Sequence, residues 1–363
     1  MMTTLEYKEE HNTDIWPADG LERVESCPVC GGTSRVLLYE RLRDRIFFCA
    51  PGEWALYRCE ECRSGYLDPR PTAETLHLAY RDYFTHANEK DTQVEQSGPF
   101  HRVFANGYRN WRYGTKAEPS SRLGVLVKAL QPGRRAKIAA EMRQMPRAWP
   151  GASLLDLGCG NGHFLELAHS AGWQVVGVDP DPKAVAVARS RGLDVCVGGI
   201  DVLDPAERQF DMITLSHVIE HVRNPITVIE VCHRLLRANG RIWLETPNLD
   251  SIGHATFRAH WRDLDPPRHL VLFTRSSLQL ALKRAGFEDI RDQPFRPVCA
   301  ELFAASEAIA EGRNPQADRR LSSGGRRRAR QADRQEANSP AIREFVTLHA
   351  EKSGTSNPQA ANG

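Results

Sequence analysis

The sequence predicts a parallel, doubly wound α/β sheet that follows a small cysteine-rich module. Between Ser153 and about Asp292, short apolar strands alternate with amphipathic helices, a pattern typical of a parallel sheet covered on both faces. Five of the 9 cysteines lie within the first 62 residues. In a reducing compartment such a cluster predicts a metal site before disulfides. Two unlike units are therefore expected, one after the other.

Composition narrows the class of protein further. The chain has 363 residues, of which 41% are hydrophobic and 26% charged, which is ordinary for a globular protein. The formal net charge is only +2, so no global field steers the chain to nucleic acid or membrane. No apolar run approaches the ~20 residues of a membrane helix. A collagen, a membrane protein and a secreted disulfide mini-domain are excluded, and we expect a cytoplasmic protein.

The sheet core is predicted element by element. Turn residues and glycines separate the apolar runs, with Pro182 near one helix start and Gly172, Gly192, Gly240 and Gly286 after helix ends, as capping preferences require. The expected strands are Ser153–Leu157, Gln174–Val178, Val195–Val197, Asp211–Leu215, Arg241–Glu245 and Phe287–Arg291. The expected helices are His163–Ala171, Pro182–Arg191, Pro225–Leu236 and Ser276–Ala285.

The remaining segments are assigned by composition. Residues 312–340 are rich in arginine and poor in apolar side chains, which predicts a disordered or solvated loop. Residues 343–352 alternate like a half-buried strand, the alternative being a disordered tail. The expected segments are a loose leader (1–20), a metal-ribbon module (21–70), a helical linker or lid (71–150), the core (151–296), a helix with an Arg-rich insertion (297–341), a last strand (342–352) and a disordered tail (353–363).

One glycine-rich turn carries the strongest chemical signal. It reads Asp156-Leu-Gly158-Cys-Gly160-Asn-Gly162 and lies between a buried strand and a helix. Glycines let the backbone pass close to a ligand, and the helix start leaves free N–H donors there. A dinucleotide fingerprint would need a glycine at position 163, which is histidine. Asp179 ends the next strand, about where a ribose-binding carboxylate is expected.

From about Ser153 to Asp292 the chain resembles the class I S-adenosylmethionine (SAM)-dependent methyltransferases, which have a seven-stranded Rossmann-like sheet. The resemblance rests on the glycine turn, on the motif at 210–222 and on the turn at 236–240. It implies that the protein binds SAM, the alternative being another nucleotide. The residues implied to contact the cofactor are Asp156, Gly158, Gly160, Gly162, Asp179 (ribose), Asp201 (adenine, with Asp204 competing), Ser216 and His217.

Two C-x-x-C pairs predict a metal site in the N-terminal module. Cys27 and Cys30 form one pair, Cys59 and Cys62 the other, and a glycine lies at or close to each pair's end. Four thiolates on two tight turns make a closed, tetrahedral and therefore structural zinc site. The alternative is free thiols. Cys49 is interpreted as a buried thiol outside the site.

The order of zinc ribbon and methyltransferase resembles a bacterial subgroup that modifies sugars and other small molecules. In its sugar C-methyltransferases a histidine in a segment resembling Arg268–Phe273 acts as base, which makes His269 the candidate general base. Those enzymes have a tyrosine three residues before this histidine and an acid directly before it, where this chain has Pro266 and Arg268. The departure favours O-methylation over C-methylation. His221 is a second candidate, its alternative role being structural.

The expected acceptor is a small molecule or a glycan. Arg258, Arg262 and Arg268 are candidates for holding a phosphate or carboxylate of that acceptor, with surface roles as the alternative. A different function is an RNA methyltransferase, in which the ribbon and the Arg-rich segment bind RNA; the near-neutral net charge disfavours it. A third is a binding module without activity. No sequence feature indicates an oligomeric state.

Overall fold

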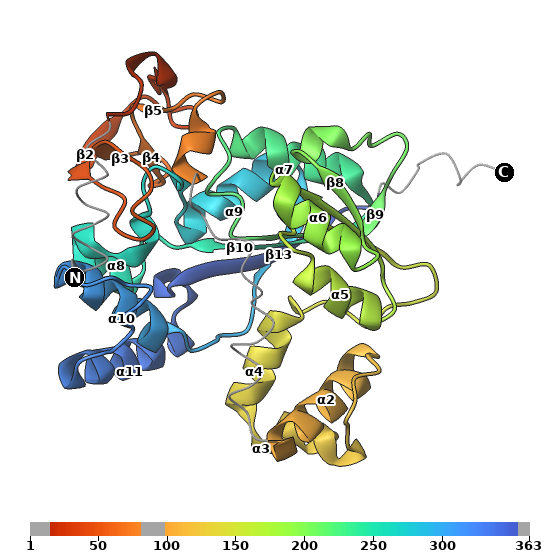
Figure 1. Ribbon diagram of the computed structural model, residues 1–363. Helices are drawn as coiled ribbons and strands as arrows, with labels where there is room; N and C mark the ends of the chain where they lie inside the picture. The colour runs from red at the N-terminus through yellow and green to blue at the C-terminus, as the bar shows by residue number, and fades with distance from the viewer. Residues whose placement is uncertain (1–14, 81–98, 355–363) are drawn as a thin grey trace.

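A computed structural model describes residues 15–80 and 99–354, and Figure 1 shows their arrangement. A seven-stranded sheet has the order β12-β13-β10-β9-β6-β7-β8. All neighbours are parallel except β13, which runs antiparallel between β10 and β12. The fold class predicted from sequence is confirmed. The strands are β6 (Ser153–Leu157), β7 (Gln174–Asp179), β8 (Asp194–Val197), β9 (Phe210–Ser216), β10 (Leu236–Pro247), β12 (Phe287–Asp292) and β13 (Phe345–Lys352).

Helices cover both faces of this sheet because successive strand residues point to opposite sides. Leu154, Met212 and Trp243 join a core with the helices on one face, whereas Leu155 and Ile213 join the core on the other face. The first face carries α2 (Pro99–Tyr113), α4 (Pro132–Glu141), α5 (His163–Ser170) and α6 (Pro182–Ser190). The second face carries α7 (Pro225–Leu235) and α9 (Arg275–Arg284).

The Arg-rich insertion is ordered, which corrects the prediction of a disordered or solvated loop. It forms helix α11 (Ser323–Asn338), which lies against α10 (Cys299–Ala310). A buried stripe of Gly325, Ala329, Ala332 and Glu336 has helical spacing, and the small residues allow close approach. The arginines project from the remaining surface, so their number did not prevent helix formation. The expected last strand is present as β13.

The ribbon module contributes a second sheet with the order β11-β4-β3-β2. Its strands β2 (Arg35–Leu42), β3 (Trp54–Cys59) and β4 (Gly65–Leu67) come from the N-terminal region. Strand β11 (Val271–Leu272) belongs to the core and pairs with Tyr66 and Gly65 of β4. The ribbon is therefore joined to the core by main-chain hydrogen bonds. A short pair, β1 (Leu21–Glu22) with β5 (Arg70–Pro71), closes the module.

Trp16 shows that the predicted loose leader is partly packed. Its side chain is buried and contacts Trp54 edge-on; residues 1–14 lie outside the described part, as do 355–363 of the predicted tail. The other short elements are η1 (Ala18–Gly20), η2 (Leu76–Tyr80), η3 (Arg122–Leu126), α3 (Val127–Leu130), η4 (Ile200–Val202), α8 (Ile252–Phe257), η5 (Arg258–His260), η6 (Arg262–Leu264) and η7 (Pro340–Ile342).

Among the described helices, not one combines the length and the apolar character that crossing a bilayer would require.

Candidate active site

The glycine turn leaves β6 in a conformation that requires glycine. Gly158, Gly160 and Gly162 all have positive φ angles, of 72°, 54° and 83°, which L side chains rarely adopt. A Cβ at Gly158 would meet Val218, whereas at Gly160 it would meet nothing within 4 Å. The backbone is thus closely packed at one glycine and open at the next. The open position fits a ligand lying against the turn.

Asp179 ends β7 directly beside this turn. Its Oδ2 accepts a hydrogen bond of 2.8 Å from the Gly160 N–H, and its Oδ1 accepts one of 2.9 Å from the Asp181 N–H. Burial raises the pKa of this carboxyl. Each carboxylate oxygen retains a second lone-pair direction. These contacts fit the predicted role of holding two ribose hydroxyls.

Asp156 and Asp201 differ from Asp179 in their surroundings. Asp156 is fully buried and forms an ion pair with Arg143, which also donates a 2.9 Å hydrogen bond to Thr214. Its carboxylate is thus engaged beneath the glycine turn. Asp201 is exposed in η4, beyond the end of β8.

Ser216 and His217 lie where β9 ends, beside the end of β10. The Nδ1 of His217 is 3.4 Å from Glu220, and its Nε2 is 3.5 Å from Glu245. Burial alone would lower the pKa of His217, but the two carboxylates outweigh it and raise that pKa to about 9. The two carboxylates therefore favour the protonated form of His217, which does not suit a general base.

The two candidate catalytic histidines meet on the same side of the sheet. The rings of His221 and His269 have centroids 4.7 Å apart and lie edge to face. The Nδ1 of His269 is 2.7 Å from the carbonyl oxygen of Asp263, so Nδ1 carries the proton and Nε2 is free to accept one. Burial, followed by the charge of His269, lowers the pKa of His221 to about 4. The Nδ1 of His221 lies 3.0 Å from both Tyr80 Oη and the Arg268 carbonyl oxygen.

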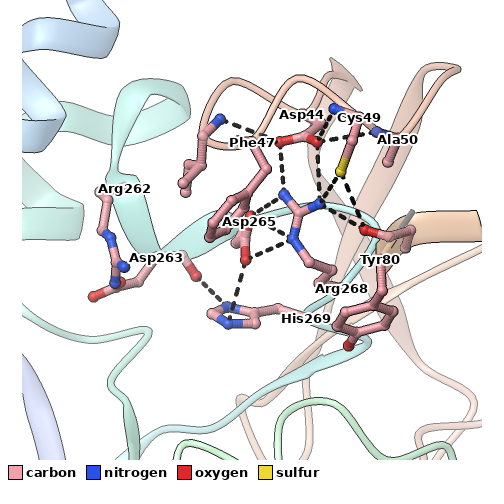
Figure 2. Close-up of polar contacts among 12 residues, drawn as sticks. Asp44, Phe47, Cys49, Ala50, Tyr80, Arg262, Asp263, Asp265, Arg268 and His269 are labelled. Carbon is pink, nitrogen blue, oxygen red and sulfur yellow. Dashed lines mark hydrogen bonds and ion pairs between the residues drawn. The ribbon is translucent and has the colours of Figure 1, made fainter. Parts of the chain in front are cut away.

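Arg268 corrects one expectation, because it is buried rather than open to an acceptor. Figure 2 shows its guanidinium between Asp44 of the ribbon and Asp265 of the core. Its Nη1 and Nη2 lie 3.0 and 2.6 Å from the two oxygens of Asp44. Asp44 also accepts four backbone N–H bonds, from Ile46, Phe47, Cys49 and Ala50. Burial would raise the pKa of Asp44, but Arg268 and these donors lower it to about 2.

The four predicted metal ligands converge in the ribbon. The Sγ atoms of Cys27 and Cys62 are 3.5 Å apart and those of Cys30 and Cys59 are 3.4 Å apart; all four lie within 4.8 Å of one another. Zinc–thiolate bonds of ~2.3 Å in a tetrahedron imply sulfur separations of about 3.8 Å. The arrangement therefore fits a four-thiolate zinc ion.

The comparisons with known proteins agree with the turn and the sheet. Residues 131–292 match the family described as "Methyltransferase domain". We refer to this matched segment as the methyltransferase domain. An ubiquinone biosynthesis O-methyltransferase of Xanthomonas campestris is 38% identical over 128 residues, 33% of this chain and 51% of that protein. One from Pseudomonas paraeruginosa is 37% identical over 105 residues, 27% of this chain and 45% of that protein. The chain spans about half the length of these curated relatives.

Solved structures similar to the methyltransferase domain include a SAM-dependent methyltransferase from Archaeoglobus fulgidus, with a TM-score of 0.42 and 19% identity over 60% of this chain and 94% of that one. Phosphoethanolamine N-methyltransferase 2 from Haemonchus contortus, in complex with SAM, has a TM-score of 0.44 and 17% identity over 80% of this chain and 63% of that one.

Sequence reasoning missed the partners that surround the predicted residues of the methyltransferase domain. Arg143 beneath Asp156, Asp44 on Arg268 and the Asp263 carbonyl on His269 all come from other segments or from the main chain. No local pattern marks such partners. One signal for Asp44 was available in the run Arg-Leu-Arg-Asp-Arg at 41–45. A single acid among three arginines is typical of a carboxylate that pairs with a cation.

Proposed function

We propose that the protein transfers a methyl group from SAM to a hydroxyl of a small-molecule or glycan acceptor, with His269 as general base. The observation that carries the proposal is the state of the His269 ring, whose Nδ1 is engaged by a carbonyl oxygen while Nε2 is available. The Leu270 N–H, next to His269, donates to the carbonyl oxygen of Glu220, which follows the carboxyl end of β9. Open α/β sheets bind ligands beyond the carboxyl ends of their strands. The O-methyltransferase relatives support oxygen as the acceptor atom.

On the cofactor side, the residues of the turn bind and orient. The open backbone at Gly160 admits the ligand, and the remaining lone pairs of the Asp179 carboxylate accept hydrogen bonds from the ribose hydroxyls. When bound, SAM supplies an electrophilic methyl carbon on a sulfonium sulfur. Methyl transfer is an in-line displacement, so holding both partners in place supplies much of the rate.

On the acceptor side, His269 takes the hydroxyl proton at Nε2. The resulting imidazolium is stabilised by Asp265, whose Oδ2 lies 3.9 Å from Nε2, and by the Asp263 carbonyl at Nδ1. His221 acts as a neutral positioning residue, because its lowered pKa leaves it unprotonated and its ring contacts that of His269. Base catalysis of this kind contributes roughly 10²–10⁴-fold.

The zinc ion is proposed as a structural element. Cys27, Cys30, Cys59 and Cys62 would hold it, and the N–H groups of Val29 and Gly32 point at the sulfurs of Cys27 and Cys30. The side chains of Glu220, His221 and His269 form a second set of possible metal ligands, with ligand atoms within 4.8 Å of one another. If His269 held a metal ion, a chelator would abolish activity, whereas a general base would be unaffected. The experiment below includes this test.

The test measures transfer of labelled methyl from SAM into a host extract, divided into small-molecule, glycan, RNA and protein fractions. We expect label in the small-molecule or glycan fraction, reduced about 100-fold or more in His269→Ala. SAM affinity should be unchanged in that variant, and exposed His77→Ala serves as the control. Full activity after a chelator has removed loosely bound metal supports a base. Label in RNA, or wild-type activity of His269→Ala, would overturn the proposal.

A further inference from the structure

A cavity of about 190 Å³ lies between the ribbon and the methyltransferase domain, away from the glycine turn. One wall is formed by residues 40–46, which end β2 and continue into the loop that follows. The opposite wall is formed by residues 259–266, and Ile309 of α10 contributes at its edge. Basic side chains reach the cavity from both walls: Arg41, Arg43, Arg45, His260 and Arg262.

The ribbon wall is organised to direct its arginines to one side. Exposure alternates from residue 41 to residue 46: the arginines at 41, 43 and 45 are exposed, whereas Leu42, Asp44 and Ile46 are buried. Asp44 anchors this stretch through Arg268 and the four backbone N–H groups described above. The arginines therefore project from a backbone that is held in place, not from a free loop.

The positive charge of the cavity is only partly neutralised. Arg43 pairs with Glu53 at 2.6 Å and Arg262 with Asp263 at 2.5 Å. Within residues 15–80 and 99–354, no carboxylate lies within ion-pair distance of Arg41 or Arg45. Of the acids that line the cavity, Asp265 is engaged by Arg268 and Glu40 is exposed. Burial, and then the charge of Arg45, lowers the pKa of His260. The guanidinium groups of Arg41 and Arg45, which have no acid of their own, favour an anion.

We propose that this cavity binds a phosphate or diphosphate group of the acceptor, an inference that rests on the proposed methyl transfer. Pockets for whole drug-sized ligands measure ~300–1,000 Å³, so a cavity of about 190 Å³ fits one charged group of a larger molecule. Guanidinium forks match the geometry of phosphate oxygens. The cavity thus sets the class of acceptor: a phosphorylated or diphosphate-linked compound.

The place of the cavity fits this role. Asp265 is one of the residues that line it, and the Oδ2 of Asp265 lies 3.9 Å from Nε2 of His269. The cavity and the proposed base therefore lie on either side of one residue. An acceptor anchored by its phosphate is kept beside the segment that carries His269, and the ribbon becomes part of the acceptor site.

The first experiment measures binding of pyrophosphate to the full chain by calorimetry, at two salt concentrations. The wild type should bind, and R41A/R45A should bind at least tenfold more weakly. The control is R234A/R327A, which removes the same charge from two exposed helical positions and should stay within twofold of the wild type. Thermal melting checks that all three proteins are folded. No binding by the wild type, or equal weakening in both double variants, would overturn the proposal.

The second experiment identifies the source of the phosphate. In the labelled-methyl assay, pyrophosphate should inhibit transfer by the wild type in competition with the acceptor fraction, and inhibition should be lost in R41A/R45A. Pyrophosphate binding without competition would overturn the assignment to the acceptor. If single-stranded RNA bound more tightly than pyrophosphate, and this binding was lost in the same variant, the cavity would be an RNA-binding site and the proposal would be overturned. If the wild type binds pyrophosphate but transfers no methyl group, the proposed function fails while the anion site is retained.

Discussion

The proposed cofactor side and the proposed acceptor side of the sheet are built in different ways. The cofactor side comes from one short stretch, the turn at 156–162, completed by Asp179 only 19 residues after Gly160. The acceptor side joins residues that are far apart: Arg268 contacts Asp44 across 224 positions, and Tyr80 contacts His221 across 141. A contiguous motif fixes its contacts locally, whereas a site assembled from separate segments depends on how those segments pack. Four experiments separate the two sides.

The largest expected effect comes from the ribbon. Cys59→Ser removes one of the four sulfurs, and the ribbon should lose zinc and several kcal/mol of local stability. We expect acceptor methylation to be abolished while SAM affinity stays within twofold, because the glycine turn has no contact with the cysteines. Zinc content, calorimetric SAM titration and methyl transfer measure this. Cys196→Ser, outside the cluster, should change none of them; equal loss of SAM binding in Cys59→Ser would show that the two sides are not separable.

Arg268→Met tests the clamp between the ribbon and the methyltransferase domain. It leaves Asp44 and Asp265 buried without their cation, and breaking a buried pair costs about 3–5 kcal/mol. The matched control is Arg275→Met, whose pair with Asp292 is partly exposed and should cost at most about 1 kcal/mol. Urea unfolding measures both. Similar losses in the two variants would mean that Arg268 contributes no more than a surface pair.

Asp179→Ala tests the cofactor side alone. Hydrogen bonds to a charged group are worth about 1.5–3 kcal/mol each, so SAM affinity should fall roughly 100-fold. Stability should also fall, because the Gly160 and Asp181 N–H groups lose their acceptor. Asp201→Ala, at an exposed position, should lower affinity only a few-fold. Calorimetric titration with SAM distinguishes them. A larger loss of SAM affinity in Asp201→Ala would mean that the main cofactor contact is made by η4 and not by β7.

The smallest effect concerns Glu336 and Glu344, two carboxyl groups that are buried near Cys299. Burial raises the pKa of Glu336 to about 7 and that of Glu344 to about 8. Because both values lie above that of the unfolded chain, their stabilisation is complete below about pH 4.5 and is lost as pH rises through 7 to 8.

Glu344→Gln cannot ionise, so its stability should exceed that of the wild type at pH 9 and match it within about 1 kcal/mol at pH 5. Half-buried Glu351→Gln, on the same strand, is the control. Urea unfolding at both pH values gives the comparison. A wild-type protein whose stability rises between pH 5 and 9 relative to Glu344→Gln would contradict the assignment.

The same contrast explains what could be predicted from sequence. Strands β6, β7, β8, β9 and β12 are short apolar runs bounded by turn residues, and the glycine turn is a contiguous motif, so these were found within one or two residues. Strand β10 begins five residues before its predicted start at Arg241, and β11 was not predicted. Helix α11 was missed because Ala329 and Ala332 are weakly apolar, and their burial depends on α10. Arg268 was taken for a ligand contact because its partner Asp44 lies in another module. Burial of Trp16 likewise depends on Trp54. Residues whose role depends on a distant segment leave no local pattern.

Strand β11 limits how this architecture can be rearranged. It begins only two residues after His269 and is the fourth strand of the ribbon sheet. Because side chains alternate along a strand, inserting or deleting one residue between His269 and Val271 would turn every β11 side chain to the opposite face. The ribbon is therefore not an exchangeable cassette. Any module grafted in its place must present a free strand edge equivalent to Gly65–Leu67. That edge must pair with β11 in the register that the residues between His269 and Val271 set.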